Sequence, residues 1–552
     1  MRTSLFRKKP IDTVSGSEGE IHGGDALGRH LTVRDLTFFG IAAIIGAGSF
    51  SSMGQACFSG GPGVIMLFVI CGIACGFTAL CYAEFAARVP ASGSAYTYAY
   101  VSFGELFAWI IGWALLMEYS IGNIYVAFSW SGYFTNLLEG FGLHMPEWLS
   151  TNYRSAHAAF DAGTAGEGLL AWNAAPMVGS LRIIFDLPAV VINTLITWLV
   201  YVGVKESRNV SNAMVMVKLA IIVLVIIVGI TYVDISNWTP FMPNGFGGVM
   251  AGVSAVFFAY IGFDAVSTLA EESKDPQRDL PRGMIYSLVI CTTVYIALAL
   301  VLTGMVDWSL LGVSDPLAEV FELRGVKWML FIVSIGAVVA MTSVLLVFQM
   351  GQPRIWMSMS RDGLLPKRFS SIHPKYKTPG FSTIMTGLVV GVPIFFTDEN
   401  FILDFTSIAT LFAFVLVCGG VLMLPRRERE KGRFHLPHMN SRWTAPVLYA
   451  ASFAAVLVFV PGYFTDLLDV SHENAQQNIS LLVFWPLALI IAVLAHVKDW
   501  SLIPVLGLTS CCYLLTGMAV SNWAWFAAWL IIGLCCYFAY GYRNSKLALK
   551  QG

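Results

Sequence analysis

The chain has 552 residues, of which 57% are hydrophobic and 12% are charged, and its mean hydropathy is +0.70. Soluble domains carry roughly 25% charged residues, so this composition excludes an ordinary soluble enzyme and indicates a membrane protein. The net charge of −1 says little about partners, because the positions of the charges matter more than their sum.

A helix that crosses a bilayer needs about 20 mostly apolar residues. Because no apolar run begins before Leu36, we expect no cleavable signal peptide. About fourteen segments are long and apolar enough to be transmembrane helices. They are Leu36–Gln55, Gly63–Ala86, Leu106–Leu138, Ile183–Gly203, Ala213–Val233, Gly248–Ala270, Met284–Met305, Trp328–Trp356, Ser382–Phe396, Phe401–Leu424, Ala445–Tyr463, Ile479–Val497, Leu502–Val520 and Asn522–Tyr542.

The basic residues predict the orientation of these spans. With the N-terminus in the cytoplasm, 28 of the 33 Lys and Arg residues fall on the inner side. Only four fall outside, and Lys218 is left within a span. This skew follows the positive-inside rule and predicts cytoplasmic N- and C-termini. The four outer residues are Arg154, Arg182, Arg324 and Lys327.

The connections between the spans do not suggest a second domain. The longest outer connection, 139–182, is rich in Gly, Ala and Asn and predicts a surface loop or a lid of short helices. No segment indicates a signalling or nucleic-acid-binding domain. The ten cysteines lie in or beside apolar segments and form no C-x-x-C pair, so we expect buried thiols, and no disulfide framework, metal site or cofactor.

Two spans are interrupted by glycine. The first contains Gly46-Ala47-Gly48, and the sixth contains Gly262 followed by Asp264, which we interpret as the N-cap of a restarting helix. The interruptions lie five spans apart, which is typical of two five-helix halves of opposite orientation. Freed amides at such a break suit a carboxylate and freed carbonyls suit an ammonium, so the pattern favours an amino-acid substrate. A simpler alternative is that these glycines only allow neighbouring helices to pack closely and mark no binding site.

The predicted organisation follows from these breaks. We expect an all-α membrane protein with a 5+5 inverted repeat and about four additional C-terminal helices. The expected parts are a cytoplasmic tail (1–35), a first five-helix repeat (36–233), a second five-helix repeat (234–424), and four final helices with a cytoplasmic tail (425–552).

Ionisable residues inside spans are expensive and are functional candidates by default. Lys218 in the fifth span could gain and lose a proton during transport, or brace neighbouring helices, with Thr342 and Ser343 as candidate partners. Glu118 in the third span shares a helical face with Gly122, and is either a cavity residue or a structural hydrogen-bonding group.

Several sequence blocks together resemble the cationic amino acid transporter family of the amino acid–polyamine–organocation superfamily, especially its bacterial members. The blocks are Leu5–Pro10, Cys81–Pro90, Ser92–Tyr96, Ala270–Arg278 and Met359–Pro366. The resemblance implies the leucine-transporter-like fold and proton-coupled transport across a plasma membrane, with a bacterial inner membrane favoured.

The resemblance also implies a set of site residues. The substrate carboxylate would meet Ala47, Gly48 and Ser49, and the substrate amine would meet the carbonyls of Ile44, Phe258 and Ile261. Glu118 and Gly122 match cavity positions of the third helix. Lys218 matches a lysine that replaces the sodium of sodium-coupled relatives. Phe348 in the eighth span is bulky enough to fill space that an arginine side chain would need, although the sequence does not place it at the cavity.

Three alternatives stay open at this stage. A proton-independent amino-acid exchanger or a polyamine carrier would use the same fold. A sensor or channel would keep the fold without pumping, although both breaks and Lys218 favour movement between states. An integral membrane enzyme is disfavoured, because we find no nucleophile with a base partner, no metal-ligand cluster and no phosphate-binding loop.

Overall fold

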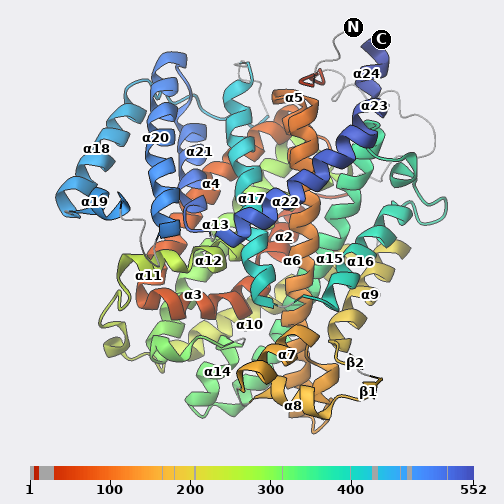
Figure 1. Cartoon of the computed structure of the whole chain (residues 1–552), viewed down its shortest axis with the longest axis vertical. Coiled ribbons are helices and arrows are strands. Elements are labelled where there is room, and N and C mark those ends of the chain that lie inside the picture. Colours follow the sequence, from red (N-terminus) through yellow and green to blue (C-terminus); the bar gives the residue numbers. More distant parts are fainter. Residues whose placement is uncertain are drawn as a thin grey trace.

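The computed structural model describes residues 5–10, 30–163, 166–179, 181–203, 207–313, 315–397, 399–425, 433–460, 462–468, 475–518 and 520–551. Most of the predicted tail 1–35 lies outside these residues. The described chain is almost entirely helical, and its one sheet is a hairpin of β1 (Met177–Val178) and β2 (Leu181–Arg182) (Figure 1). The predicted all-α class is therefore confirmed apart from this hairpin.

The helices coincide with the predicted spans to within a few residues at most ends. Before residue 233 they are α2 (Val33–Ile44), α3 (Met53–Gly60), α4 (Val64–Arg88), α5 (Ala95–Ser102), α6 (Glu105–Gly140), α7 (Tyr153–Ala162), α8 (Glu167–Ala174), α9 (Leu187–Val202) and α10 (Ser207–Ile230). From there to residue 424 they are α11 (Gly245–Ala251), α12 (Val253–Tyr260), α13 (Pro276–Met305), α14 (Pro316–Leu323), α15 (Lys327–Arg361), α16 (Gly380–Ile394) and α17 (Glu399–Met423). The last are α18 (Thr444–Phe459), α19 (Tyr463–Leu468), α20 (Ala475–Lys498), α21 (Leu502–Leu515), α22 (Val520–Cys536), α23 (Tyr542–Asn544) and α24 (Lys546–Gln551).

The lengths and composition of these helices suit a multi-pass membrane protein. Within the described residues, 7 helical stretches are long and apolar enough to cross a bilayer, and 8 if α11 and the segment after its 45° bend form one span. The count of fourteen stays a prediction, because other expected spans are apolar helices of only 10–17 residues.

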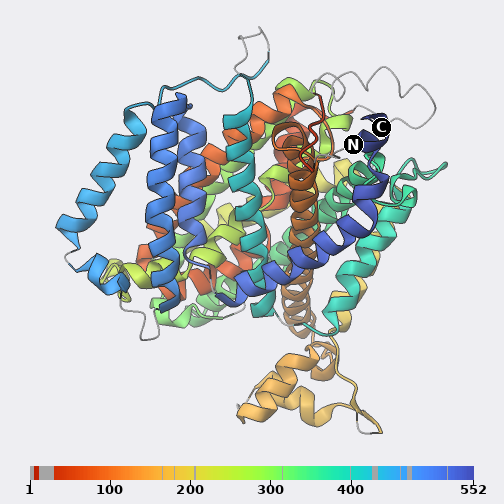
Figure 2. The same ribbon diagram turned by 45° about the horizontal axis from the view of Figure 1, so that its top comes forward.

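Long helices form the centre of the bundle. α6 packs against α15 and α17, and α13 packs against α2 and α4. α9 packs against α16, and α21 lies against α4 and α17. Figure 2 shows α18, α20 and α21 together on one side of this bundle.

The long outer connection forms a small appendage of its own. The helices α7 and α8 enclose a core of Ala156, Ala171, Ala175 and Ile184. The Arg182 guanidinium lies over the Trp172 ring, 5.1 Å from its centroid. Figure 2 shows this unit projecting from one end of the bundle, so the prediction of short helices here is confirmed.

The cysteines divide between interior and surface. Seven are buried and Cys512 is half-buried, as expected of small apolar side chains. The expectation of burial is wrong for Cys535 and Cys536, which are exposed near the end of α22. Both lie on a helix whose outer face is apolar, where a thiol is tolerated without burial.

The two interrupted helices touch each other through their glycines. A Cβ added to Gly48 would lie 2.5 Å from the Ala259 Cα of α12. A Cβ added to Gly262 would lie 2.6 Å from the Ala43 Cβ of α2, and Gly262 also has a φ of 114° that L-residues rarely adopt. Each break therefore needs a glycine so that the other backbone can approach.

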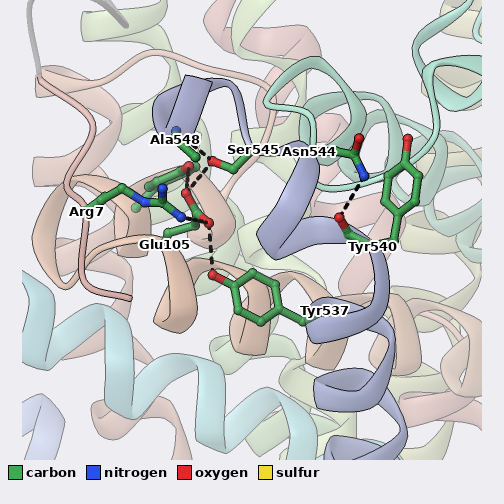
Figure 3. Close-up of polar contacts among 8 residues, drawn as sticks. Arg7, Glu105, Tyr537, Tyr540, Asn544, Ser545 and Ala548 are labelled. Atoms are coloured by element: carbon green, nitrogen blue, oxygen red, sulfur yellow. Dashed lines mark hydrogen bonds and ion pairs between the residues drawn. The ribbon is translucent and has the colours of Figure 1, made fainter. Parts of the chain in front are cut away.

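A buried carboxylate ties both ends of the described chain to the bundle (Figure 3). Glu105, at the start of α6, is fully buried and pairs with Arg7 at 3.0 Å. It also accepts hydrogen bonds from Tyr537 at 2.9 Å and from Ser545 at 2.5 Å. Tyr100 adds a fourth donor at 2.9 Å. One carboxylate thus joins the N-terminal segment 5–10, α6 and the C-terminal helices.

We predict that Glu105→Gln lowers the apparent melting temperature in detergent substantially, because it leaves the Arg7 guanidinium buried without its counter-ion. Breaking a buried pair costs about 3–5 kcal/mol. Glu271→Gln is the matched control, since the Glu271–Arg361 pair is about 30% exposed. An exposed pair contributes about 0–1 kcal/mol, so equal melting shifts in the two variants would contradict this account.

We predict that Gly262→Ala destabilises the protein, by about 1–3 kcal/mol from backbone strain alone. Contact with Ala43 adds to this cost. The control is Gly132→Ala on α6, where an added Cβ meets nothing within 4 Å. Thermal unfolding should distinguish the two variants, and a wild-type melting temperature for Gly262→Ala would contradict the proposed contact.

Candidate functional site

The first break begins where α2 ends at Ile44. Ile45 is extended, with φ of −81° and ψ of 105°, and the chain then forms one π-helical turn over Gly48–Ser52 before α3. The Gly46 carbonyl accepts hydrogen bonds from the amides of Ser49 and Phe50, at 3.0 and 3.1 Å. Carbonyls at the end of α2 are left without helical partners by this change of direction.

Lys218 of α10 supplies donors to these carbonyls. Its Nζ donates to the Ala42 carbonyl at 3.1 Å and to the Ile45 carbonyl at 2.6 Å. The third contact, 2.9 Å, is to the Ser343 hydroxyl of α15. An ammonium has three N–H donors and no acceptor, so all its hydrogen-bonding capacity is used here. Lys218 is fully buried and joins three helices at the first break.

Only one of the two partners predicted for Lys218 contacts it. Ser343 does, and its own hydroxyl donates to the Ala340 carbonyl at 2.6 Å. Thr342 instead accepts a hydrogen bond from the Trp130 indole at 2.9 Å. Neighbouring positions on a helix point about 100° apart, so one residue of such a pair faces α10 and the other faces α6.

Two of the three carbonyls predicted to receive a substrate amine already have donors in this conformer. The Tyr295 hydroxyl of α13 donates to the Ile44 carbonyl at 2.7 Å. The Ile261 amide donates to the Phe258 carbonyl at 3.2 Å. A carbonyl has two lone pairs, so each could accept a second donor.

The second break separates α12 from a 3-10 segment over Phe263–Glu272. Its N-cap position is held by Gly262, and Asp264 lies in the first turn. The interpretation of Asp264 as the N-cap is therefore wrong. Gly262 takes that position because only a residue with positive φ can reverse the chain so close to Ala43.

A small cavity lies between the two breaks. Its volume is about 10 Å³. Five of the eight predicted substrate-binding residues line it, namely Ile44, Ala47, Gly48, Phe258 and Ile261. The others are Ala43, Val126 of α6, and Val344 and Phe348 of α15. Every described residue that lines this cavity is apolar. The space holds roughly one water molecule, so the site must widen to admit a substrate.

Three predicted site residues lie beside this cavity and do not line it. The Ser49 hydroxyl donates to the Gly46 carbonyl at 3.0 Å. Gly122 faces Phe348, whose Cε2 would lie 2.8 Å from an added Cβ. Glu118 lies one helical turn before Gly122 on α6 and is 2% exposed. Their roles stay predictions.

Some residues at the site were not predicted from the sequence. Tyr295 is one, although a polar ring in the middle of an apolar span is a signal of a buried hydrogen bond. Val126 and Val344 offer no such signal, because they are ordinary apolar residues of long helices. The bulk of Phe348 is evident from the sequence, and the structure places this residue at the cavity.

Comparison with known proteins agrees with this architecture. Residues 31–493 match the model of the amino acid permease family, and residues 502–545 match the model of the C-terminus of these permeases. The chain is 37% identical to a branched-chain amino acid permease of Bacillus subtilis over 99% of this chain and 100% of the relative.

Two further relatives differ in what their names say they carry. A methylthioribose transporter of Bacillus subtilis is 41% identical, over 83% of this chain and 94% of its own. Human cationic amino acid transporter 4 is 30% identical, over 94% of this chain and 88% of its own. The chain belongs to the amino acid permease family of the amino acid–polyamine–organocation superfamily.

Proposed function

We propose that this permease is a secondary active transporter that carries neutral L-amino acids with apolar side chains, by proton-coupled symport and alternating access. The observation that carries the proposal is the apolar cavity between two broken helices, with the Lys218 ammonium bound to the first break. The broken helices offer polar backbone groups for the carboxylate and amine, and the lining offers apolar contacts for the side chain.

The helix contacts support a 5+5 inverted repeat. Spans that would be equivalent in the two halves pack against each other, namely α4 with α13, α6 with α15 and α9 with α16. The two broken spans also contact each other, as the glycines of both breaks require. Pairs of equivalent helices meet in this way when they lie near a two-fold axis in the membrane plane.

The lining of the cavity favours a neutral over a cationic substrate. Phe348 packs against Gly122 on one side of the cavity, and its aromatic ring fills space next to Val126 and Val344. A guanidinium or ammonium here would lose its hydration without a partner among the described lining residues, which is costly. The full-length likeness to a branched-chain amino acid permease agrees with this choice.

Lys218 could couple a proton to movement of the first break. As an ammonium it donates to Ala42, Ile45 and Ser343. After loss of a proton the neutral amine has two N–H donors and a lone pair, which cannot face a carbonyl oxygen favourably. Either the Ser343 hydroxyl turns its proton from the Ala340 carbonyl to this lone pair, or one of the three contacts is given up, so loss of the proton rearranges the hydrogen bonds at the break.

We further propose a multi-pass arrangement in a plasma membrane, most simply a bacterial inner membrane, with both termini cytoplasmic. The distribution of Lys and Arg supports this orientation. The Arg7–Glu105 cluster would then lie at the cytoplasmic ends of α6 and α22.

The competing functions differ in the substrate that is carried or in whether its transport is coupled to protons. A proton-independent exchanger would use the same cavity, whereas a polyamine carrier conflicts with its apolar lining. Methylthioribose is a second candidate substrate, because a relative 41% identical is named for it and its methylthio group suits an apolar cavity. A sensor or channel would bind amino acids without accumulating them.

We predict that Lys218→Met loses gradient-driven uptake of leucine by about tenfold or more, a change of at least 1.4 kcal/mol. The assay uses purified protein in liposomes, in sodium-free buffer, with and without an inward proton gradient. Exchange of leucine between the two sides should persist, because it needs no net proton transfer. Labelled arginine, putrescine and methylthioribose serve as competing substrates.

The possible outcomes separate the hypotheses. Gradient-stimulated uptake by Lys218→Met at the wild-type level would reduce Lys218 to a structural brace. Wild-type uptake indifferent to the gradient would indicate an exchanger. Saturable leucine binding without any uptake would indicate a sensor.

We predict that Phe348→Ala reduces the preference for leucine over arginine, because it opens space beside Gly122. Apolar pocket contacts of this size contribute about 1–3 kcal/mol to selectivity, or roughly 10–200-fold. Leu346→Ala is the control, since Leu346 is buried on the same helix but does not line the cavity. Competition of arginine against labelled leucine measures the change, and equal selectivity in both variants would contradict the assignment of Phe348.

A further inference from the structure

A second and much larger cavity lies away from the broken helices. Its volume is about 850 Å³, and it is a half-open groove lined by α18, α19, α20 and α21, with α11 at one side. Along α18 it extends from Ala445 to Val460, and along α20 from Asn478 to Ala492. At 1.5 Å per residue these stretches are about 20 Å long, so the cavity is a slot parallel to the helices. Figure 2 shows α18 standing apart from α20 and α21, with α19 at its far end.

The wall of this slot is mostly apolar. The Ser and Thr hydroxyls that line it each donate to a carbonyl of their own helix, and the Tyr449 hydroxyl of α18 donates to the Trp485 carbonyl of α20 at 3.4 Å. Ser452 donates to Tyr449 at 2.8 Å, Thr509 to Val505 at 2.8 Å, Ser510 to Gly507 at 3.1 Å and Thr516 to Tyr513 at 2.7 Å. The remaining lining is mostly aromatic and aliphatic. A mostly apolar wall of this kind favours a hydrocarbon over a polar ligand.

One end of the slot is polar and acidic. Asp466 of α19 and Asn478 of α20 lie there, and the Asn478 amide donates to the Asp466 carbonyl at 2.9 Å. No Lys or Arg occurs among the described residues that line the slot. Anionic lipid head groups are held by basic side chains, whereas a carboxylate attracts an ammonium. The polar end therefore suits a head group that bears an amine.

The length of the slot distinguishes between occupants. A transmembrane helix must span roughly 30 Å of hydrocarbon, whereas the slot runs for about 20 Å along α18 and α20. The acyl chains of one phospholipid span half of that hydrocarbon, about 15 Å, and therefore fit within the slot.

We propose that the slot between α18 and the α20–α21 pair binds one diacyl phospholipid with an amine-bearing head group of the phosphatidylethanolamine class. Its acyl chains lie along the helices, and its ammonium lies at Asp466. The lipid joins the peripheral helices α18 and α19 to the bundle, at a position remote from the small cavity between the breaks.

Native mass spectrometry of the full chain, delipidated in detergent and then mixed with phosphatidylethanolamine or phosphatidylglycerol, tests this proposal. Two variants fill the slot, Ala488→Trp on α20 and Ser452→Trp on the peripheral α18, where misfolding is easier to avoid. Val493→Trp is the control, because Val493 is 51% exposed on α20 and does not line the slot. Size-exclusion profiles establish that each variant is folded.

The wild type and Val493→Trp should retain one phosphatidylethanolamine, and both slot-filling variants should bind it about tenfold more weakly. Asp466→Asn should keep lipid binding but lose the preference for phosphatidylethanolamine over phosphatidylglycerol. Wild-type binding by both slot-filling variants would overturn the site. An absence of head-group preference in the wild type would overturn the assignment of the amine to Asp466.

Discussion

A helix that is broken inside a membrane leaves backbone carbonyls without partners, in a solvent that cannot replace them. In this permease the Lys218 ammonium provides that replacement at the end of α2, through Ala42 and Ile45, while Tyr295 provides it at Ile44. The break can exist because these donors reach it from α10 and α13. The same dependence makes the break sensitive to any change in the proton content of Lys218.

The cavity follows from the same arrangement. Gly48 and Gly262 allow the two broken helices to approach each other, and α6 and α15 close the remaining sides with Val126, Val344 and Phe348. The result is an apolar space with polar backbone at its edges, too small for an amino acid in this conformer. Binding of a substrate thus requires movement of the helices around it, as alternating access does.

The sequence predicts the helices and both breaks well, because apolar length and mid-span glycines are local signals. It also finds the Lys218–Ser343 contact and five of the cavity residues. The Asp264 cap was wrong because the backbone conformation at Gly262 decides the cap position. The partner of Tyr295, the place of Val126 at the cavity and the slot beside α18 could not be predicted, since they depend on how separate helices rotate and pack. The roles of Glu118 and Gly122 stay predictions.

The central claim is that Lys218 holds the first break together. Hydrogen–deuterium exchange of peptides covering residues 41–52, compared between wild type and Lys218→Met at one pH, tests it most directly. The account predicts faster exchange at the break in the variant, with unchanged exchange in α20 as an internal reference. Identical exchange at the break in both proteins would show that the Lys218 contacts do not hold it and would contradict the account.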